Sequence, residues 1–148
     1  MTKLKVEIIA DNLMAIHPLL YKSISKPLRS KTSITPGGMF VMDSLKRRGT
    51  LSMSDIGKCL SMPKPHITVI VDKLIDEGYV VRHNNSNDRR IINISLTDKG
   101  LIDFEDIRQA LSETLKSKLV LLNDQELEQL VEASQKMKEI LTSILSRE

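Results

Sequence analysis

The fold is decided by residues 63–80, PKPHITVIVDKLIDEGYV. Because proline is tolerated in a helix only in the first turn, Pro63 and Pro65 predict a helix that begins at about Met62. Gly78 is placed to end this helix as a C′ glycine. One face is apolar and carries Ile67, Ile70, Val71 and Leu74, whereas Pro65, Thr68, Val69, Asp72 and Lys73 lie on or beside the opposite face.

Strand-forming residues follow this helix directly. Residues 79–81 are Tyr-Val-Val, and from Ile92 to Leu96 apolar residues alternate with polar ones. The intervening segment RHNNSNDRR, residues 82–90, is polar and rich in Asn, which is typical of a hairpin tip. The sequence therefore predicts a two-stranded β-wing whose tip holds Arg82, Arg89 and Arg90.

Three helices are expected before residue 63. Apolar residues at spacings of three and four predict a long first helix over residues 4–28, with a kink at Pro18 and an end or a second bend at Pro27. The second helix is expected to end near residue 48, and Thr35 with Pro36 is typical of its N-cap and first position.

The remaining helices are marked by their caps. A short third helix is expected over residues 52–60, with Ser54 or Ser52 as its cap. After the wing, a fifth helix is expected to run from about Thr97 to Leu122, and Asn123 with Glu126 predicts a capping box that starts a sixth.

The composition bounds the class of protein. The chain has 148 residues, 41% hydrophobic and 28% charged, with two Tyr, two Phe and no Trp, which suits one mainly helical domain. A single cysteine excludes an intrachain disulfide framework and a multi-cysteine metal site. Because no run of about 18 apolar residues and no secretory signal is found, we expect a cytoplasmic protein without a membrane partner.

The net charge of +3 is divided unevenly along the chain. Residues 46–100 hold 10 basic and 6 acidic groups, whereas residues 101–148 hold 6 basic and 10 acidic groups. A basic middle segment followed by an acidic one favours an anionic partner for the middle segment and a different role for the end of the chain.

The order of the elements is that of a winged helix-turn-helix. In such a lobe the third helix braces the fourth, whose first residues can enter the DNA major groove, while the wing places cations on the backbone or in the minor groove. Lys46, Arg47, Arg48 and the amides at the start of the fourth helix are expected to add phosphate contacts. Because single-strand and most RNA binders stack bases on aromatic rings, the scarcity of aromatics favours double-stranded DNA.

Four stretches of the sequence resemble the MarR (multiple antibiotic resistance regulator) family of transcription factors. They are ITPGGMFVMDSL at 34–45, LSMSDIGKCLSM at 51–62, ITVIVDKLIDEGYVVR at 67–82 and NDRRIINISLTDKG at 87–100. The last of these resembles the family's wing and its exit into the next helix, and is the most specific. Element order and length match over essentially the whole chain.

The resemblance implies one MarR-type domain over residues 1–148, mainly α with a small β-hairpin wing. Its winged lobe would span about 35–100, flanked by dimerisation helices at about 1–30 and 101–148. It further implies a homodimer on a pseudo-palindromic operator, usually a repressor released by a small-molecule ligand. By the same comparison, Arg90 resembles the wing arginine that enters the minor groove, and Asp88 resembles the carboxylate that steadies it.

The start of the fourth helix departs from the family. Members often carry a basic residue where this chain has Val69, and small polar residues where it has MPKP. The candidates for base contacts are therefore Lys64, His66 and Thr68, with Val69 able to contact a thymine methyl group. Lys73 is expected to add charge to this recognition helix.

Several alternatives remain open at this point. The lobe could be a winged-helix protein-interaction module that does not bind DNA. Cys59 is either a redox switch or an inert core thiol, and His17 either borders a ligand cleft or is a helix histidine with a satisfied hydrogen bond. An enzyme is not expected, because no nucleophile, base and oxyanion donors occur together. His17, His66 and His83 lie on different elements, so neither a metal nor a cofactor is expected.

Overall fold

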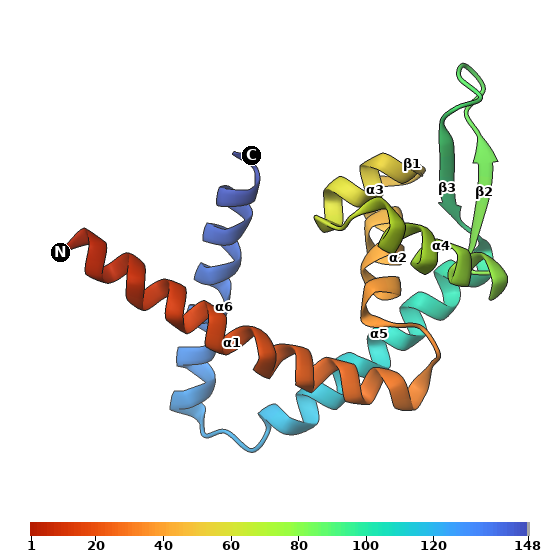
Figure 1. The fold of residues 1–148 in the computed structure, drawn as a ribbon. Helices are drawn as coiled ribbons and strands as arrows, with labels where there is room; N and C mark the ends of the chain where they lie inside the picture. Colours follow the sequence, from red (N-terminus) through yellow and green to blue (C-terminus); the bar gives the residue numbers. More distant parts are fainter. Residues whose placement is uncertain (148) are drawn as a thin grey trace. The chain divides into compact units, whose positions relative to one another are not determined.

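The computed structural model describes residues 1–147 and divides into two compact units, of which the first spans Met1–Leu111 and the second begins at Ser112. Figure 1 shows the order of the elements. They are α1 (Thr2–Lys31), α2 (Pro36–Arg48), β1 (Leu51–Ser52), α3 (Met53–Leu60), α4 (Lys64–Asp76), β2 (Val80–Asn84), β3 (Ile92–Leu96), α5 (Asp98–Leu119) and α6 (Asp124–Leu145). The mainly α fold with a small β-wing is confirmed.

The core of the first unit is built almost entirely from aliphatic side chains. Phe104 on α5 is the one aromatic residue among them within residues 1–147, as the composition predicts. Helices α2, α3 and α4 and the sheet surround this core. Its buried members are Ile34, Val41, Met42, Leu45, Ile56, Ile67, Val71, Leu74, Val80, Ile94 and Phe104.

Side-chain caps start three of the helices where the sequence predicts them. Thr35 Oγ1 accepts a hydrogen bond from Gly38 N at 3.1 Å, and Ser52 Oγ accepts one from Asp55 N at 3.1 Å. In α6, Asn123 and Glu126 form the expected capping box, in which each side chain accepts from the other's backbone N–H at 2.9 Å. Each cap satisfies a backbone donor that the helix itself leaves without a partner.

The sheet contains one strand that the sequence analysis did not predict. Its three strands are antiparallel in the order β1-β3-β2, with Leu51 opposite Ile94 and Val80 opposite Leu96. Because β1 has only two residues, it carries no alternation that could reveal it. It forms through pairing with β3, and it joins the start of α3 to the wing, while β2 forms the opposite edge of the sheet.

A closely packed junction connects the end of α4, the base of the wing and the start of α5. Thr97 Oγ1 donates to Gly78 O at 2.7 Å, and it accepts from Gly100 N at 3.0 Å. Gly78 has φ +78°, as expected of the glycine that ends α4. Gly100 is buried against Tyr79, and a Cβ atom at position 100 would lie 2.0 Å from Tyr79 O. The base of the wing is therefore held in place between the end of α4 and the start of α5.

Three helix boundaries differ from the sequence prediction. Helix α1 continues through Pro18 and Pro27 to Lys31, so Pro27 does not end it, and Leu28 beyond this proline is fully buried. A proline inside a helix removes one hydrogen bond, and the burial that follows Pro27 offsets that loss. Helix α4 begins at Lys64 because Pro63 takes the N-cap position, and α5 ends at Leu119, three residues earlier than predicted.

The two terminal helices expose many apolar side chains. Helix α1 exposes residues of both its halves, and α6 in the second unit has no buried residue. No helix within residues 1–147 is long and apolar enough to cross a membrane. Among the exposed apolar residues of α1 and α6 are Leu4, Val6, Ile8, Ile9, Leu19, Leu20, Leu130, Val131, Ile140, Ile144 and Leu145.

Candidate nucleic-acid interface

A groove of about 350 Å³ lies between the start of α3, the first turns of α4 and the wing. Three of its lining residues, Lys64, Arg82 and Arg90, are cations, and none of the residues found to line it carries a carboxylate. Its polar lining is completed by hydroxyl groups. The full lining is Ser52, Met53, Ser54, Lys64, Thr68, Arg82, Arg90, Ile91 and Ile92. Such a groove is suited to an anion, and its cations come from two separate elements of the lobe.

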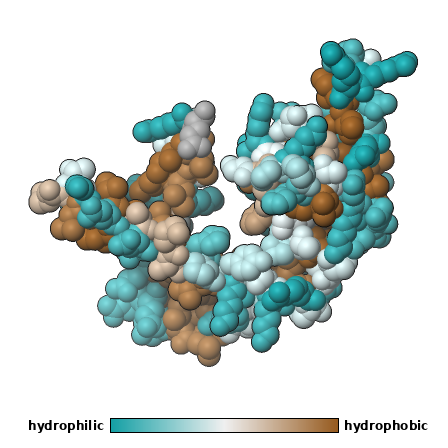
Figure 2. Space-filling model, in the orientation of Figure 1, coloured by the Kyte–Doolittle hydropathy of each residue, from teal (hydrophilic) through white to brown (hydrophobic). Residues whose placement is uncertain are grey.

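The wing tip presents Arg90 in a fixed orientation. Asp88 Oδ1 accepts from Arg90 N at 3.0 Å and from Arg90 Nε at 3.2 Å, and Asp88 Oδ2 accepts from Arg90 Nη2 at 3.2 Å. The Arg90 side chain is nevertheless 91% exposed. Figure 2 shows hydrophilic side chains gathered at this end of the wing. Asp88 therefore orients the guanidinium group of Arg90 without covering it.

The same contacts keep Asp88 ionised. Hydrogen bonds from the Arg90 side chain and backbone hold the pKa of the Asp88 carboxyl below its ordinary value of 3.8. A carboxyl group with a lowered pKa stays charged until the pH falls through that lowered value. Pairing of Asp88 with Arg90 is therefore present throughout the neutral range and is lost only in acid.

Arg82 does not lie at the wing tip, so this part of the sequence prediction is wrong. It lies in the middle of β2, opposite Ile94, and its Nη2 donates to Asp72 Oδ1 on α4 at 2.7 Å. The strand register moves the tip beyond Asn84, and this places Arg82 beside α4 instead. The ion pair joins α4 to the wing, and it places a cation next to a carboxylate on the face of α4 that would meet DNA.

The first turn of α4 offers few amides to a phosphate group, contrary to the sequence prediction. Pro65 has no N–H group, and the amides of His66 and Ile67 donate to Pro63 O at 3.0 and 3.2 Å. Charge at this end of the helix comes instead from Lys64, which lines the groove.

The other predicted residues of the recognition helix divide into two groups. His66 and Val69 are exposed, the latter to 70%, and Thr68 lines the groove. Lys73 is turned away, because its Nζ donates to Ser33 O at 2.9 Å. The structure thus brings Lys64, Thr68, Arg82 and Arg90 together around one groove, and does not bring Lys73 to it.

Two of the cations at the end of α2 are also engaged within the lobe. Lys46 forms an ion pair with Glu105 on α5, and Arg47 forms one with Asp43. Lys46 Nζ also lies 5.8 Å from the centre of the Phe104 ring. Each of these two residues therefore balances a carboxylate of the lobe, and their contact with phosphate groups stays a prediction.

Five residues that line the groove were not predicted as site residues from the sequence: Ser52, Met53, Ser54, Ile91 and Ile92. Ser52, Met53 and Ser54 line the groove, although only a capping role was expected of the two serines. The available signal was the position of α3 immediately before the helix with the two prolines. Asp72 was expected on or beside the face of this helix that is opposite its apolar face, and its pairing with Arg82 depends on strand register, for which the sequence carried no signal.

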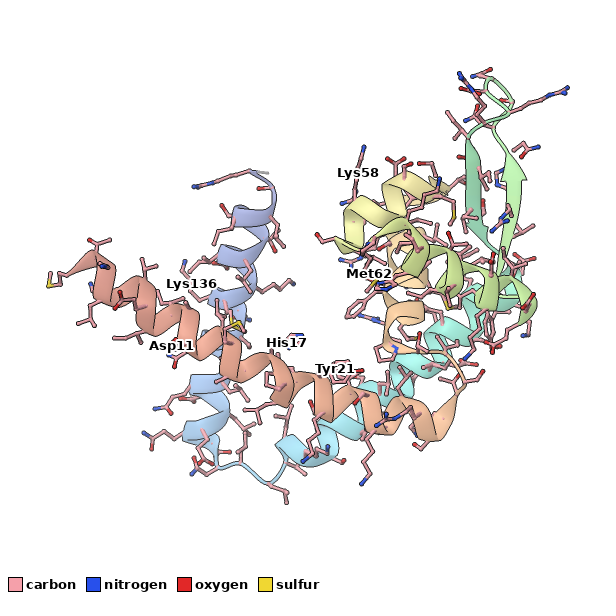
Figure 3. All side chains as sticks on the ribbon, viewed as in Figure 1. Asp11, His17, Tyr21, Lys58, Met62 and Lys136 are labelled. Atoms are coloured by element: carbon pink, nitrogen blue, oxygen red, sulfur yellow. The ribbon has the colours of Figure 1, made fainter. Side chains whose placement is uncertain are left out.

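The remaining candidates lie outside this groove. His17 and Tyr21 on α1 stack with ring centres 6.4 Å apart, and Figure 3 shows both side chains on that helix. Cys59 is half-buried. Within residues 1–147 no group of three or more His, Cys, Asp or Glu side chains is placed to hold a metal ion.

Known proteins share both this sequence pattern and this fold. A MarR family profile matches residues 34–92. The HTH-type transcriptional repressor MdtR of Bacillus subtilis is 29% identical over 133 residues, covering 88% of this chain and 86% of that protein. The HTH-type transcriptional regulator FarR of Neisseria gonorrhoeae is 30% identical, covering 67% of this chain and 73% of that protein.

Solved structures show the same architecture. The YusO protein from Bacillus subtilis is 26% identical with a TM-score of 0.71, covering 90% of this chain and 96% of that one. The apo form of MarR from E. coli has a TM-score of 0.78 at 22% identity, covering 86% of this chain and 94% of that one. The MarR profile match, the extent of the FarR similarity and the shared winged fold lead to one conclusion: the chain belongs to the MarR family of transcriptional regulators.

Proposed function

We propose that this regulator binds double-stranded operator DNA as a homodimer, with α4 in the major groove and the wing against the backbone and minor groove. The observation that carries the proposal is the groove at which Lys64, Arg82 and Arg90 converge beside the exposed start of α4. Cations on two elements of a rigid lobe can neutralise phosphate groups on both sides of an inserted helix. A MarR mutant from E. coli with a TM-score of 0.69 to this chain is described in complex with operator DNA.

The proposal assigns the terminal helices to the dimer interface. The lobe over about 35–100 would bind DNA, and the helices over about 1–30 and 101–148 would hold two copies together. Exposed apolar side chains on α1 and α6 support this assignment, because a single chain that leaves so many in water gains stability when a second copy covers them. The two-fold symmetry of the dimer would then place the two half-sites of the operator about one turn of the DNA helix apart.

The regulator would act as a repressor in the cytoplasm, and a small-molecule ligand would release it from DNA. No catalytic activity is proposed for it. MdtR, which is similar over most of its length, is named a transcriptional repressor. His17 is the candidate ligand contact. His17 stacks on Tyr21, and a stacked aromatic pair of this kind is suited to contact a planar organic molecule.

DNA binding is tested by titration of the purified protein with random and selected duplexes at several salt concentrations. We expect binding to random duplex at about 50 mM salt, with log K falling linearly as log salt rises, because bound cations release counterions from the phosphates. Selection of bound genomic fragments would then supply the operator. Absence of binding to any duplex at low salt would favour the alternative, in which the wing contacts a protein.

The Arg82–Asp72 pair provides a second prediction. We expect Arg82→Ala to weaken operator binding about fivefold, because it removes one cation from the groove and leaves the carboxylate of Asp72 unpaired near phosphate groups. Adding Asp72→Asn to this variant should recover part of the affinity. Fluorescence anisotropy with the four proteins of this double-mutant cycle measures the effect, and strictly additive changes would contradict it.

A further inference from the structure

The outer face of α4 presents apolar groups where the helix would meet the bases. Val69 lies on the exposed side of the N-terminal half of α4, and its side chain is 70% exposed. Pro65, one turn earlier on the same face, is exposed as well. Thr68 Oγ1 donates its one proton to Lys64 O at 3.0 Å, so the hydroxyl cannot donate to a base.

The polar side chains around Val69 are held by other parts of the lobe. Asp72 accepts from Arg82 at 2.7 Å, and Lys73 donates to Ser33 O at 2.9 Å. Both contacts draw a charged group toward a neighbouring element, β2 in the first case and the segment before α2 in the second. The middle of α4 therefore presents the exposed methyl groups of Val69 between charged side chains that are held by neighbouring elements.

The edges of the base pairs contain one apolar group in the major groove, the C5-methyl group of thymine. Hydrogen-bonding base atoms placed against Val69 would lose water without gaining a partner, which is unfavourable. The cations of the adjacent groove would hold the helix at the phosphates at the same time. Together these features provide an apolar contact at the bases with charged contacts beside it.

We infer that Val69, with the ring of Pro65 and the γ-methyl group of Thr68, contacts thymine methyl groups, so that each operator half-site carries thymines beneath the middle of α4. The inference rests on the proposed DNA binding. Specificity at these base pairs then comes from methyl–methyl contact, and the hydrogen bonds to bases come from the first turn, where Lys64 and His66 are exposed.

The test uses an operator selected by the wild-type protein, in which single thymidines are replaced by deoxyuridine. This change removes only the C5-methyl group and keeps the base pairing. We expect affinity to fall about three- to fourfold for each contacted methyl group, the fold-change that corresponds to about 0.8 kcal/mol. Scanning the half-site locates the contacted thymines by fluorescence anisotropy.

Variants of the protein assign the effect to a side chain. With Val69→Ala, the ratio of affinities for the thymidine and deoxyuridine duplexes should approach one at the contacted positions. With Phe40→Ala, which truncates an exposed apolar residue on α2, outside α4, the wing and the helices assigned to the dimer, the ratio should stay as in the wild type.

Three results would overturn the inference while leaving DNA binding intact. They are an operator without thymines in its half-sites, a wild-type affinity that deoxyuridine does not change, and a deoxyuridine effect that persists undiminished in Val69→Ala. Failure to recover any duplex would instead overturn the proposed function, and the inference with it.

Discussion

Arg90→Ala is expected to weaken operator binding about tenfold or more, which corresponds to at least about 1.4 kcal/mol. Asp88 already holds the guanidinium group of Arg90 in place, so little side-chain entropy is lost when it meets the minor groove or a phosphate. The melting temperature should not fall, because the side chain is 91% exposed and contributes nothing to the core. Gel-shift titration and thermal melting measure the two quantities.

Arg108→Ala is the matched control for this prediction. Arg108 is an exposed cation on α5, so its removal lowers the net charge by the same amount as removal of Arg90. We expect its effect on operator affinity to be within about twofold, because it adds no directed contact to DNA. Equal losses in both variants would show that Arg90 acts only through net charge, and an unchanged affinity in Arg90→Ala would refute the assignment of the wing.

The second large effect is expected from Gly100→Ala, which should destabilise the fold by about 3 kcal/mol. The new Cβ atom would lie 2.0 Å from Tyr79 O and 2.8 Å from Tyr79 C, and both of these are backbone atoms that cannot rotate away. The junction made by Thr97 has to shift in order to accommodate it. The melting temperature should fall by about 10 °C, measured by circular dichroism at one fixed protein concentration.

Gly57→Ala separates this steric effect from the general cost of replacing a glycine. Gly57 lies inside α3, where a Cβ atom would come no closer than 3.4 Å to Met62 O, an ordinary contact distance. Because alanine is favoured over glycine in a helix by about 1 kcal/mol, this variant should be as stable as the wild type or more so. A Gly100→Ala protein that melts with the wild type would contradict the tight packing at the junction.

Local signals predicted most of the fold. Pro63 and Pro65 located the start of the recognition helix to within two residues, because the chemistry of proline restricts it to the first turn. Thr35, Ser52 and Asn123 start their helices as caps, since each satisfies a donor within its own turn. Such features depend only on residues a few positions away in the chain, so the local sequence is enough to predict them.

Contacts between distant residues were much less predictable. Arg82 was expected at the wing tip, but the register of β2 against β3 places it next to Asp72, ten residues earlier in the chain. Lys73 was expected to face DNA, and a carbonyl group 40 residues away, that of Ser33, takes its ammonium group instead. Periodicity does not identify the partner of Arg82 or of Lys73, because many polar groups of the fold could accept a hydrogen bond from either side chain.

The open edge of the wing sheet bears on how the protein behaves at high concentration. Within residues 1–147 no strand pairs with the outer side of β2, and an unpaired strand edge can join the edge of another molecule and begin an aggregate. Arg82 and His83 lie in the middle of this strand, where a second copy would bring like side chains together. The Arg82 side chain at this edge therefore opposes edge-to-edge pairing of two wings.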